Sequence, residues 1–372
     1  MNTHVFIVNE QTFKCHLEYM FAGIGAKDKK SSFLCDASVK FNAASERNLV
    51  SMIADVSRVQ IGDNIIFYLQ ASKSKQGQFF GVFKAKSQAF FDENDSNNYL
   101  KFELGKGLSY RILIEPSDYG VYQKGVTEHE YLDSLEGKNH PYELCWSLIY
   151  RKLKGNRGCT MITDYEFNNL LSKLKNKSER LSTFSSYTYN LLSDSISENN
   201  NSSIYAGRQE SLSITNRLIY KANKKNSFEA HLQAYILQNI RSLNLLNYPE
   251  SDFWIGNEVS CGVGMQRIDI LLIQETDDRL YFKVIELKDE QPTKNIVDYQ
   301  LDWYIKWLLD YIVPNYSKKS IEITPCIVAD KTNNDELIDY IAKKRFDNSS
   351  VRSTEYYAIN IGKDNINLEK IL

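Results

Sequence analysis

The sequence predicts a two-domain α/β protein, with a small β-barrel-like α+β domain in the N-terminal half and a mixed sheet flanked by helices in the C-terminal half. Three observations lead to this expectation. The chain has 372 residues, more than one typical domain. Its 42% hydrophobic and 25% charged residues are typical of a folded globular chain and not of a disordered one. Segments rich in β-branched and aromatic residues alternate with segments of helical periodicity.

Residues 1–175 are predicted to form the first domain. Strands are expected where β-branched and aromatic residues gather between Gly, Asp, Asn or Lys-Ser clusters. These segments read HVFIVN, DNIIFYLQ, GQFFGVFKAKSQAFF and YRILIEP. One helix is expected over SERNLVSMIADVSRV, with Ser45 as its cap. A second is expected after Thr163, whose hydroxyl can cap the helix while Glu166 reaches back.

Residues 176–226 are predicted to be a linker, because SDSISENNNSS offers too little apolar surface to offset the entropy of ordering it. The second domain is expected over residues 227–372. A helix from about Phe228 to Ile240, capped by Ser227, precedes strands at WIGNEVSCG, MQRIDILLI and YFKVIELK. VDYQLDWYIKWLLDYIV then predicts a long amphipathic helix, and ITPCIVAD and EYYAINI predict further strands. This order is typical of a sheet with helices packed on it.

An acid in one strand, with an acid and a lysine in the next, forms the candidate site. Asp269 lies among apolar residues in RIDILLI, and a carboxylate in a buried strand needs a partner. In VIELK, Glu286 and Lys288 are two residues apart and therefore share one face of the sheet. A hairpin that turns at QETDDR would set Asp269 beside Glu286. Two adjacent carboxylates repel each other unless a cation lies between them, so we expect Mg²⁺ or Mn²⁺ there.

Lys288 would add a positive charge beside this metal. It could orient or help to deprotonate an attacking water, or stabilise the negative charge that grows on a phosphate. Taken alone, an acid followed by Glu-x-Lys also arises as a surface salt bridge in many α/β proteins.

The order of these residues resembles the PD-(D/E)xK nuclease superfamily, with Ile in place of the usual Pro before Asp269. Glu229, in FEAHLQAYI, is similar to a Glu on the first helix of this superfamily that often reaches the metal through water. Gln300 and Tyr304 have the QxxxY spacing that follows the Lys in several of these nucleases, and residues i and i+4 share one helix face. The motifs look most like the NucS-type nuclease domain over about residues 226–372.

This resemblance implies a restriction-endonuclease-like fold and a Mg²⁺- or Mn²⁺-dependent, restriction-type DNA endonuclease that hydrolyses phosphodiester bonds. Asp269 and Glu286 would hold the metal, and Lys288 would position or activate the water. Glu229 and Gln300 would support them. Cleavage of both strands needs two sites, so a homodimer is expected, at least on DNA. A mismatch or branched-DNA repair endonuclease and a non-catalytic nucleic-acid reader are the alternatives.

Two further residues near the candidate site have two interpretations each. Glu258, in GNEVSCG, is either an added acid of the metal site or a charge on an edge strand. Arg267 would face a phosphate of bound DNA if the site is catalytic, and would otherwise be a solvated cation at a strand end.

The first domain is expected to choose the target. VQIGDNIIFYLQ followed by GQFFGVFKAKSQAFF resembles EVE and PUA-like small barrels over about residues 3–150. This resemblance implies a domain that binds nucleic acid and holds a flipped, sometimes modified, base in an aromatic pocket. The candidate rings are those of Phe6, Tyr19, Phe21, Phe33, Phe67 and Tyr68. Packing in the core is the alternative use of each ring.

The net charge of −2 offers no global basic excess for a nucleic-acid partner, so binding to double-stranded DNA would use local patches. The clearest patch is IYRKLKGNRGC, where cations surround a Gly-Asn turn and could converge with backbone amides on phosphates. Its cations are Arg151, Lys152, Lys154 and Arg157. A solvated charged face is the alternative interpretation.

The remaining sequence features concern the compartment. The six cysteines include no CxxC pair, which favours a reducing cytoplasm without structural disulfides. No charged-then-apolar leader opens the sequence, and no apolar run approaches the roughly 20 residues of a membrane-spanning helix. We therefore expect a cytoplasmic protein that does not span a membrane.

Overall fold

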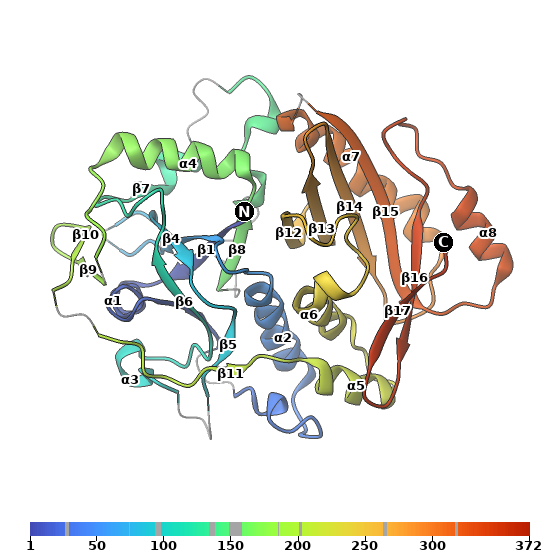
Figure 1. Ribbon diagram of the computed structural model, residues 1–372, viewed down its shortest axis with the longest axis horizontal. Coiled ribbons are helices and arrows are strands. Elements are labelled where there is room, and N and C mark those ends of the chain that lie inside the picture. Colours follow the sequence, from blue (N-terminus) through green and yellow to red (C-terminus); the bar gives the residue numbers. More distant parts are fainter. Residues whose placement is uncertain are drawn as a thin grey trace. The chain divides into compact units, whose positions relative to one another are not determined.

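The computed structural model describes residues 1–26, 30–73, 75–93, 98–133, 138–148, 158–184, 186–200, 203–262, 266–316 and 319–372 (Figure 1). The chain forms two compact units. Unit 1 consists of Met1–Cys35, Val39–Asn139 and Ser147–Leu212, and unit 2 of Asp36–Ser38, His140–Trp146 and Ser213–Leu372. Each unit contains strands and helices, which confirms the α/β class.

A nine-stranded sheet forms the framework of unit 1. Its main path runs β11-β5-β6-β4-β3-β1-β8, while β2 pairs with β6 and β7 with β4. β1 and β3 are parallel, and the other pairs are antiparallel. The strands are β1 Thr3–Val8, β2 Phe21–Ile24, β3 Asn64–Leu69, β4 Gln78–Ala85, β5 Phe90–Phe91, β6 Tyr110–Pro116, β7 Val126–Thr127, β8 Cys159–Ile162 and β11 Glu210–Ser211. The four predicted strand segments are all present. In the part of the chain that the structure describes, β11 and β8 do not pair, so the path stays open and the expected barrel does not close.

The helices of unit 1 show both a confirmed and a wrong cap prediction. They are α1 Glu10–Tyr19, α2 Ala43–Ser57, α3 Lys101–Leu104 and α4 Asp164–Lys177. At α4, the Thr163 hydroxyl accepts the Glu166 N–H, and the Glu166 carboxylate accepts the Thr163 N–H at 2.7 Å, as predicted. At α2, the cap is Asn42 and not Ser45, because the Asn42 side chain accepts the Ser45 N–H and the helix begins at Ala43. Asn and Ser cap about equally well, so sequence alone could not choose between them.

The segment predicted to be a linker, residues 176–226, contains regular structure. It holds the antiparallel pair β9 (Tyr187–Asn190) and β10 (Ser195–Glu198), then β11, and then helix α5 (Thr215–Asn223). Tyr187, Tyr189 and Ile196 are buried. These few apolar side chains anchor a segment whose average composition is polar, and this is why the composition was misleading.

Unit 2 is built on a six-stranded mixed sheet. Its strands follow the order of the sequence, β12-β13-β14-β15-β16-β17. β14, β15 and β16 are parallel neighbours, while β12, β13 and β14 at one side and β16 with β17 at the other pair antiparallel. The strands are β12 Phe253–Ser260, β13 Arg267–Glu275, β14 Arg279–Leu287, β15 Ser320–Asp330, β16 Glu355–Ile361 and β17 Ile366–Lys370. The predicted mixed sheet is therefore present.

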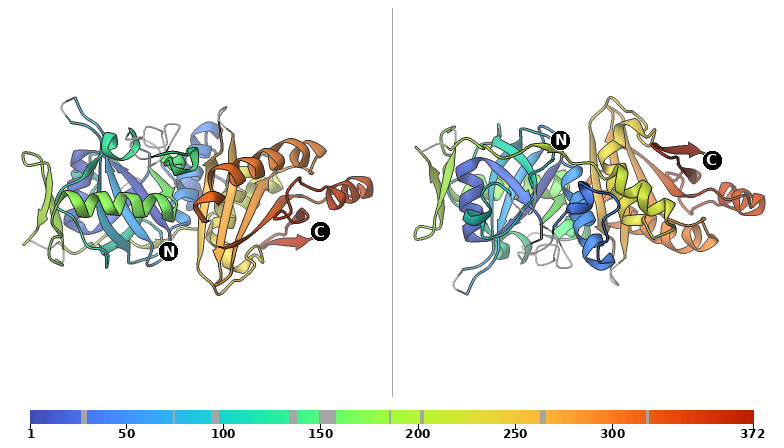
Figure 2. Two further views of the ribbon diagram at one scale, coloured as in Figure 1. Left: turned by 90° about the horizontal axis from the view of Figure 1, so that it is seen from above. Right: turned by 90° about the horizontal axis from the view of Figure 1, so that it is seen from below.

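Helices cover both faces of this sheet: α6 lies on one face and α7 on the other (Figures 1 and 2). The helices of unit 2 are α5, α6 (Glu229–Asn239), α7 (Asp302–Tyr311) and α8 (Asp335–Lys343). A π-helical segment, η6 (Ile296–Leu301), leads directly into α7. Helix α6 begins at Glu229 with Phe228 in the N-cap position, so the prediction of Ser227 as the cap was wrong. Within the described ranges, no helix is long and apolar enough to cross a membrane.

Candidate functional site

The β13–β14 hairpin brings the two predicted carboxylates together. Its register pairs Ile270 with Ile285, which sets Asp269 opposite Glu286. The backbone N–H of Leu287 donates a hydrogen bond of 2.7 Å to Oδ2 of Asp269 and fixes that side chain against β14. The neighbouring positions of Asp269 and Glu286 follow from the hairpin that the sequence predicts.

Lys288 joins Glu286 on the same face of the sheet. Its Nζ lies 2.5 Å from Oε1 of Glu286 and 3.8 Å from Oε2 of Glu229, the first residue of α6. The Glu286 side chain is 2% exposed, whereas Lys288 and Glu229 are partly exposed. The structure therefore places Asp269, Glu286, Lys288 and Glu229 in one cluster at the edge where β14 ends.

Gln300 and Tyr304 reach the cluster from the segment after β14. Nε2 of Gln300, in η6, donates a hydrogen bond of 2.8 Å to Oε1 of Glu286. Tyr304, in α7, is buried. Burial raises the pKa of its hydroxyl, and the carboxylates of Glu286 and Asp269 raise it further. Both residues of the predicted QxxxY pair thus face the two acids, although Gln300 does so from a π-helical turn.

The electrostatics of the cluster are dominated by its excess of acids. Burial raises the pKa of Asp269 well above its usual value, and the adjacent Glu286 raises it further. For Lys288, burial lowers the pKa, but Glu286 and Glu229 outweigh this effect, so the amine has a raised pKa and is protonated at neutral pH. An additional cation near Asp269 and Glu286 would therefore relieve a repulsion that the fold itself creates.

The residues present fit a hard divalent cation. Among the residues that the structure describes, Oε2 of Glu286 is buried and has no hydrogen-bond partner, although buried carboxylate oxygens are normally paired. Among the residues that the structure describes, no group of three or more His, Cys, Asp or Glu side chains is placed to hold a metal. Mg²⁺ is commonly bound by one or two carboxylates, with waters and substrate phosphates as its other ligands. Asp269 and Glu286 suit this mode of binding.

Glu258 and Arg267 pair with each other near the candidate site. Glu258 lies on β12 between two residues that pair with Ile268 and Ile270, and therefore opposite Asp269. Its Oε2 is 2.8 Å from the Arg267 guanidinium, whose side chain is 42% exposed. β12 is the edge strand of the sheet, which agrees with the interpretation of Glu258 as an edge-strand charge. Arg267 is two residues before Asp269, on the same face of β13, and remains accessible to a ligand.

The two other groups of predicted site residues lie in the N-terminal half. Arg151, Lys152, Lys154 and Arg157 fall outside the described residues. Of the six candidate base-pocket rings, those of Phe6, Phe21, Phe33, Phe67 and Tyr68 are at most 1% exposed, and Tyr19 is half-buried. The Phe67 ring, for example, packs 5.5 Å from that of Phe13 in the core. Five of these six rings therefore pack in the core.

Two site neighbours were not singled out from the sequence. Gln233, one turn after Glu229 in α6, donates a hydrogen bond of 3.0 Å to the backbone oxygen of Asp269. Asp289, directly after Lys288, accepts hydrogen bonds at the start of α6. The i, i+4 spacing of Glu229 and Gln233 was a visible signal for the first, because such residues share one helix face.

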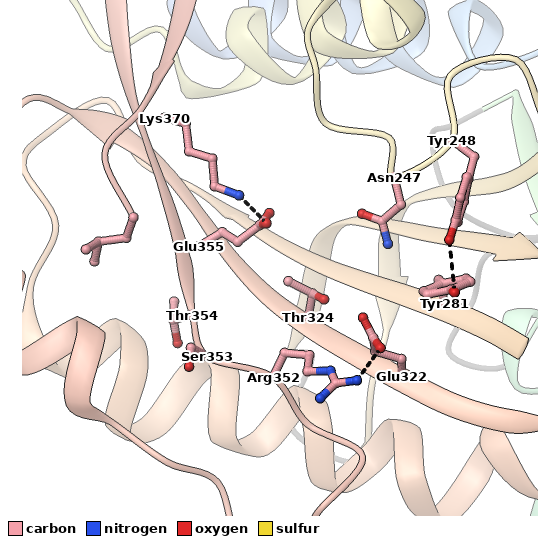
Figure 3. A pocket seen from close by; sticks show the side chains of 11 residues that line it. Asn247, Tyr248, Tyr281, Glu322, Thr324, Arg352, Ser353, Thr354, Glu355 and Lys370 are labelled. Atoms are coloured by element: carbon pink, nitrogen blue, oxygen red, sulfur yellow. Dashed lines mark hydrogen bonds and ion pairs between the residues drawn. The ribbon is translucent and has the colours of Figure 1, made fainter.

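Unit 2 also contains a cavity of about 620 Å³ on the same sheet, around residues of β14, β15, β16 and β17 (Figure 3). Its charged side chains are paired with one another. Arg352 contacts Glu322 at 2.6 Å, and Lys370 contacts Glu355 at 2.5 Å. Because these acids have cationic partners, the cavity lacks the excess of carboxylates that distinguishes the Asp269–Glu286 cluster.

Comparisons with known proteins identify no family for the chain. No protein-family model matches the sequence, and no curated protein matches it either. A solved structure of a hypothetical protein from Leishmania major is similar, with 8% identity and a TM-score of 0.30 over 48% of this chain and 96% of that one. A structure of human THYN1 in complex with 5-methylcytosine containing DNA is similar, with 12% identity and a TM-score of 0.26 over 48% of this chain and 99% of that one. Similarities this low leave the function to be argued from the residues of this chain.

Proposed function

We propose that the protein is a divalent-metal-dependent DNA endonuclease of restriction type, with its active site at Asp269, Glu286 and Lys288. The observation that carries this proposal is the pairing of a buried carboxylate, Glu286, and an adjacent half-buried one, Asp269, with a lysine 2.5 Å from Glu286. Two adjacent carboxylates in such a place repel each other and lower the stability of the fold unless a cation binds to them. The order of Glu229, Asp269, Glu286, Lys288 and Gln300 along the chain supports the same conclusion through its resemblance to PD-(D/E)xK nucleases.

In the proposed reaction, the oxygen of a water molecule forms a bond to phosphorus while the bond to the leaving oxygen breaks. The water loses one proton to solvent, and the leaving oxygen takes up one. A divalent cation, held by Asp269 and Glu286, would supply positive charge that stabilises the phosphate and acidifies water. Lys288, held by its ion pairs with Glu286 and Glu229, would place a second positive charge beside the phosphate.

The surrounding residues would keep the two carboxylates oriented. The N–H of Leu287 fixes Asp269, and the Gln300 amide fixes Glu286. These hydrogen bonds are made before any substrate arrives, so little reorganisation would be needed during the reaction. Arg267, accessible beside the site, would contact a DNA phosphate.

We further propose that unit 1 selects the DNA, by a modified base or a short sequence, and that the protein dimerises on DNA to cut both strands. Support for the first part is the resemblance of the N-terminal segments to EVE and PUA-like domains. Digestion of unmodified, methylated, hydroxymethylated and mismatched duplexes separates this function from the repair endonuclease. Preference for mismatched or branched DNA would replace the restriction-type assignment.

Plasmid cleavage in the presence of Mg²⁺ tests the active site directly. Asp269→Asn keeps an oxygen that can accept the Leu287 N–H but removes the charge, and we expect cleavage to fall by about 10³-fold. Asp277→Asn, at an exposed acid in the turn of the same hairpin, is the matched control and should cleave normally. Equal cleavage by the wild type and Asp269→Asn would remove the site assignment. DNA binding without any cleavage by the wild type would favour the non-catalytic reader.

A further inference from the structure

The start of helix α6 is capped by a residue far away in the sequence. Phe228, in the N-cap position, provides no side-chain hydrogen bond. Asp289 takes this role: its Oδ2 accepts the Phe228 N–H at 2.8 Å and the Ser227 hydroxyl at 2.5 Å. The N–H of Glu229 also donates to this carboxylate. The first N–H groups of a helix have no partner within the helix, and a negative charge there is favourable.

These contacts hold Asp289 in its charged form. Burial raises its pKa, but the hydrogen bonds from Ser227, Phe228 and Glu229 outweigh burial, and the pKa stays below its usual value. The carboxylate is therefore ionised at neutral pH and remains an acceptor.

Helix α6 delivers two side chains to the candidate active site. Glu229, its first residue, lies 3.8 Å from Nζ of Lys288, and Gln233 donates to the backbone oxygen of Asp269 at 3.0 Å. Asp289 follows Lys288 directly in the chain. The two residues that follow β14 thus contact the start of α6 separately. Lys288 pairs with the Glu229 side chain, and Asp289 accepts hydrogen bonds from the backbone N–H groups of Phe228 and Glu229.

We propose that Asp289 is a positioning residue of the nuclease site, which fixes the first turn of α6 so that Glu229 faces Lys288. This inference rests on the proposed function, and Asp289 acts through Glu229 without touching the substrate. The ion pair between Glu229 and Lys288 depends on the position of the first turn of α6, because the attraction between the two charges weakens as their distance grows. A small shift of the first turn of α6 would therefore leave Lys288 bound to Glu286 alone.

Three variants separate this role from a general effect on folding. Asp289→Ala removes the acceptor, Asp289→Asn keeps one, and Ser227→Ala removes only the neighbouring hydroxyl. Asn caps helices about as well as Asp. We expect Asp289→Ala to lower kcat for plasmid cleavage about tenfold with an unchanged KM for DNA, and Asp289→Asn to restore most of the loss. The same loss in both variants, or a loss confined to KM, would overturn the inference.

A double-mutant cycle tests whether Asp289 acts through Glu229. In a Glu229→Gln background, adding Asp289→Ala should change kcat by less than about twofold, since the side chain that it positions has already been altered. A further tenfold loss in this background would show an independent effect and contradict the inference.

Amide hydrogen exchange and a crystal structure test the link without any catalysis. In Asp289→Ala, the amides of Phe228 and Glu229 should exchange at least about fivefold faster, and the Glu229–Lys288 distance should exceed the 3.8 Å of the wild type. Asp289→Asn should leave both unchanged. Unaltered exchange and distance in Asp289→Ala would refute the positioning role even if the protein cleaves DNA. A wild type that cleaves no DNA would refute the proposed function while these two measurements still decide whether Asp289 positions Glu229.

Discussion

Strand β14 carries buried charges at two places, and the two places differ in how their charges are balanced. At the Glu286 end, the carboxylates of Asp269 and Glu286 adjoin each other, and Oε2 of Glu286 has no hydrogen-bond partner in the described part of the chain. Three residues earlier, on the other face of the strand, Lys283 is buried and lies 2.9 Å from Glu355. Glu355 also contacts Lys370 at 2.5 Å (Figure 3).

The pKa values of Glu355 and Asp269 shift in opposite directions. Although burial raises the pKa of Glu355, Lys283 and Lys370 outweigh burial and lower it. At Asp269, burial and Glu286 both raise the pKa. Buried charge alone therefore does not identify a functional site, because the Lys283–Glu355 pair already satisfies itself. The acids at Glu286 and Asp269 have no such balance, and they are the ones for which we propose a ligand from outside the chain.

The largest expected effect is on metal binding. Glu286→Gln should weaken Mn²⁺ binding by more than about 100-fold in isothermal titration, because even the outer hydrogen-bond partners of metal ligands are worth about 10–100-fold. Glu355→Gln changes an acid of the same sheet and should bind Mn²⁺ like the wild type. Equal loss of Mn²⁺ binding in both variants would erase the proposed difference between the two clusters.

The free energy of unfolding should rank the same two variants in the opposite order, with the larger loss in Glu355→Gln. Glu355→Gln leaves the buried Lys283 without its charged partner and should lower the free energy of unfolding of unit 2 by about 3 kcal/mol. Glu286→Gln removes an acid from a repelling pair and should cost less than about 1 kcal/mol. All four tryptophans, Trp146, Trp254, Trp303 and Trp307, belong to unit 2, so denaturation followed by tryptophan fluorescence reports this unit. A larger loss in Glu286→Gln would mean that its cluster serves stability.

Gln300 offers a smaller test of the same site. Gln300→Ala removes the amide that orients Glu286 and should lower cleavage about 10- to 100-fold, with Mn²⁺ affinity reduced in parallel. Tyr299→Phe, at the exposed neighbour on the same turn, is the control and should be close to the wild type. Normal cleavage by Gln300→Ala would show that Glu286 needs no such support.

His16 in unit 1 is a buried titratable group that differs from both clusters, because neither of its ring nitrogens is hydrogen-bonded to any residue that the structure describes. Burial lowers its pKa well below 6.5, and Arg111 lowers it further. Because the folded pKa is below the unfolded one, the unfolded state takes up the extra proton, and stability falls as pH drops below about 6.5, by at most about 1.4 kcal/mol per pH unit.

His16→Leu should remove this acid sensitivity. Urea unfolding of unit 1 can be monitored by hydrogen exchange of peptides from this unit, measured at the same pH for both proteins. Between pH 6.5 and 5.5, the variant should lose less stability than the wild type. An identical loss in both proteins would mean that His16 does not contribute to it.

Much of the candidate site follows from local rules. The polar turn between two apolar strands fixes the register, and the register sets Asp269 beside Glu286. The period of two places Glu286 and Lys288 on one face. The α/β class and most strands also follow from such patterns. The orphaned oxygen of Glu286 and the Glu258–Arg267 pair do not, because they depend on side-chain positions across strands.

The wrong predictions have a common cause in contacts between distant parts of the chain. Ser227 appeared to be the cap of α6, whereas its hydroxyl donates to Asp289, 62 residues away. The Ser-rich segment appeared to be a linker, whereas Tyr187 and Ile196 bury themselves in unit 1. For the six aromatic rings of the expected base pocket, the sequence left both uses open, because a pocket and a core favour the same strand positions, and the structure buries five of them.

The most direct measurement is the anomalous scattering of Mn²⁺ in crystals of the protein. The account predicts a peak within coordination distance, about 2.1 Å, of carboxylate oxygens of both Asp269 and Glu286. No peak there, with Mn²⁺ bound elsewhere or not at all, would contradict the claim that these two acids form a metal-dependent active site.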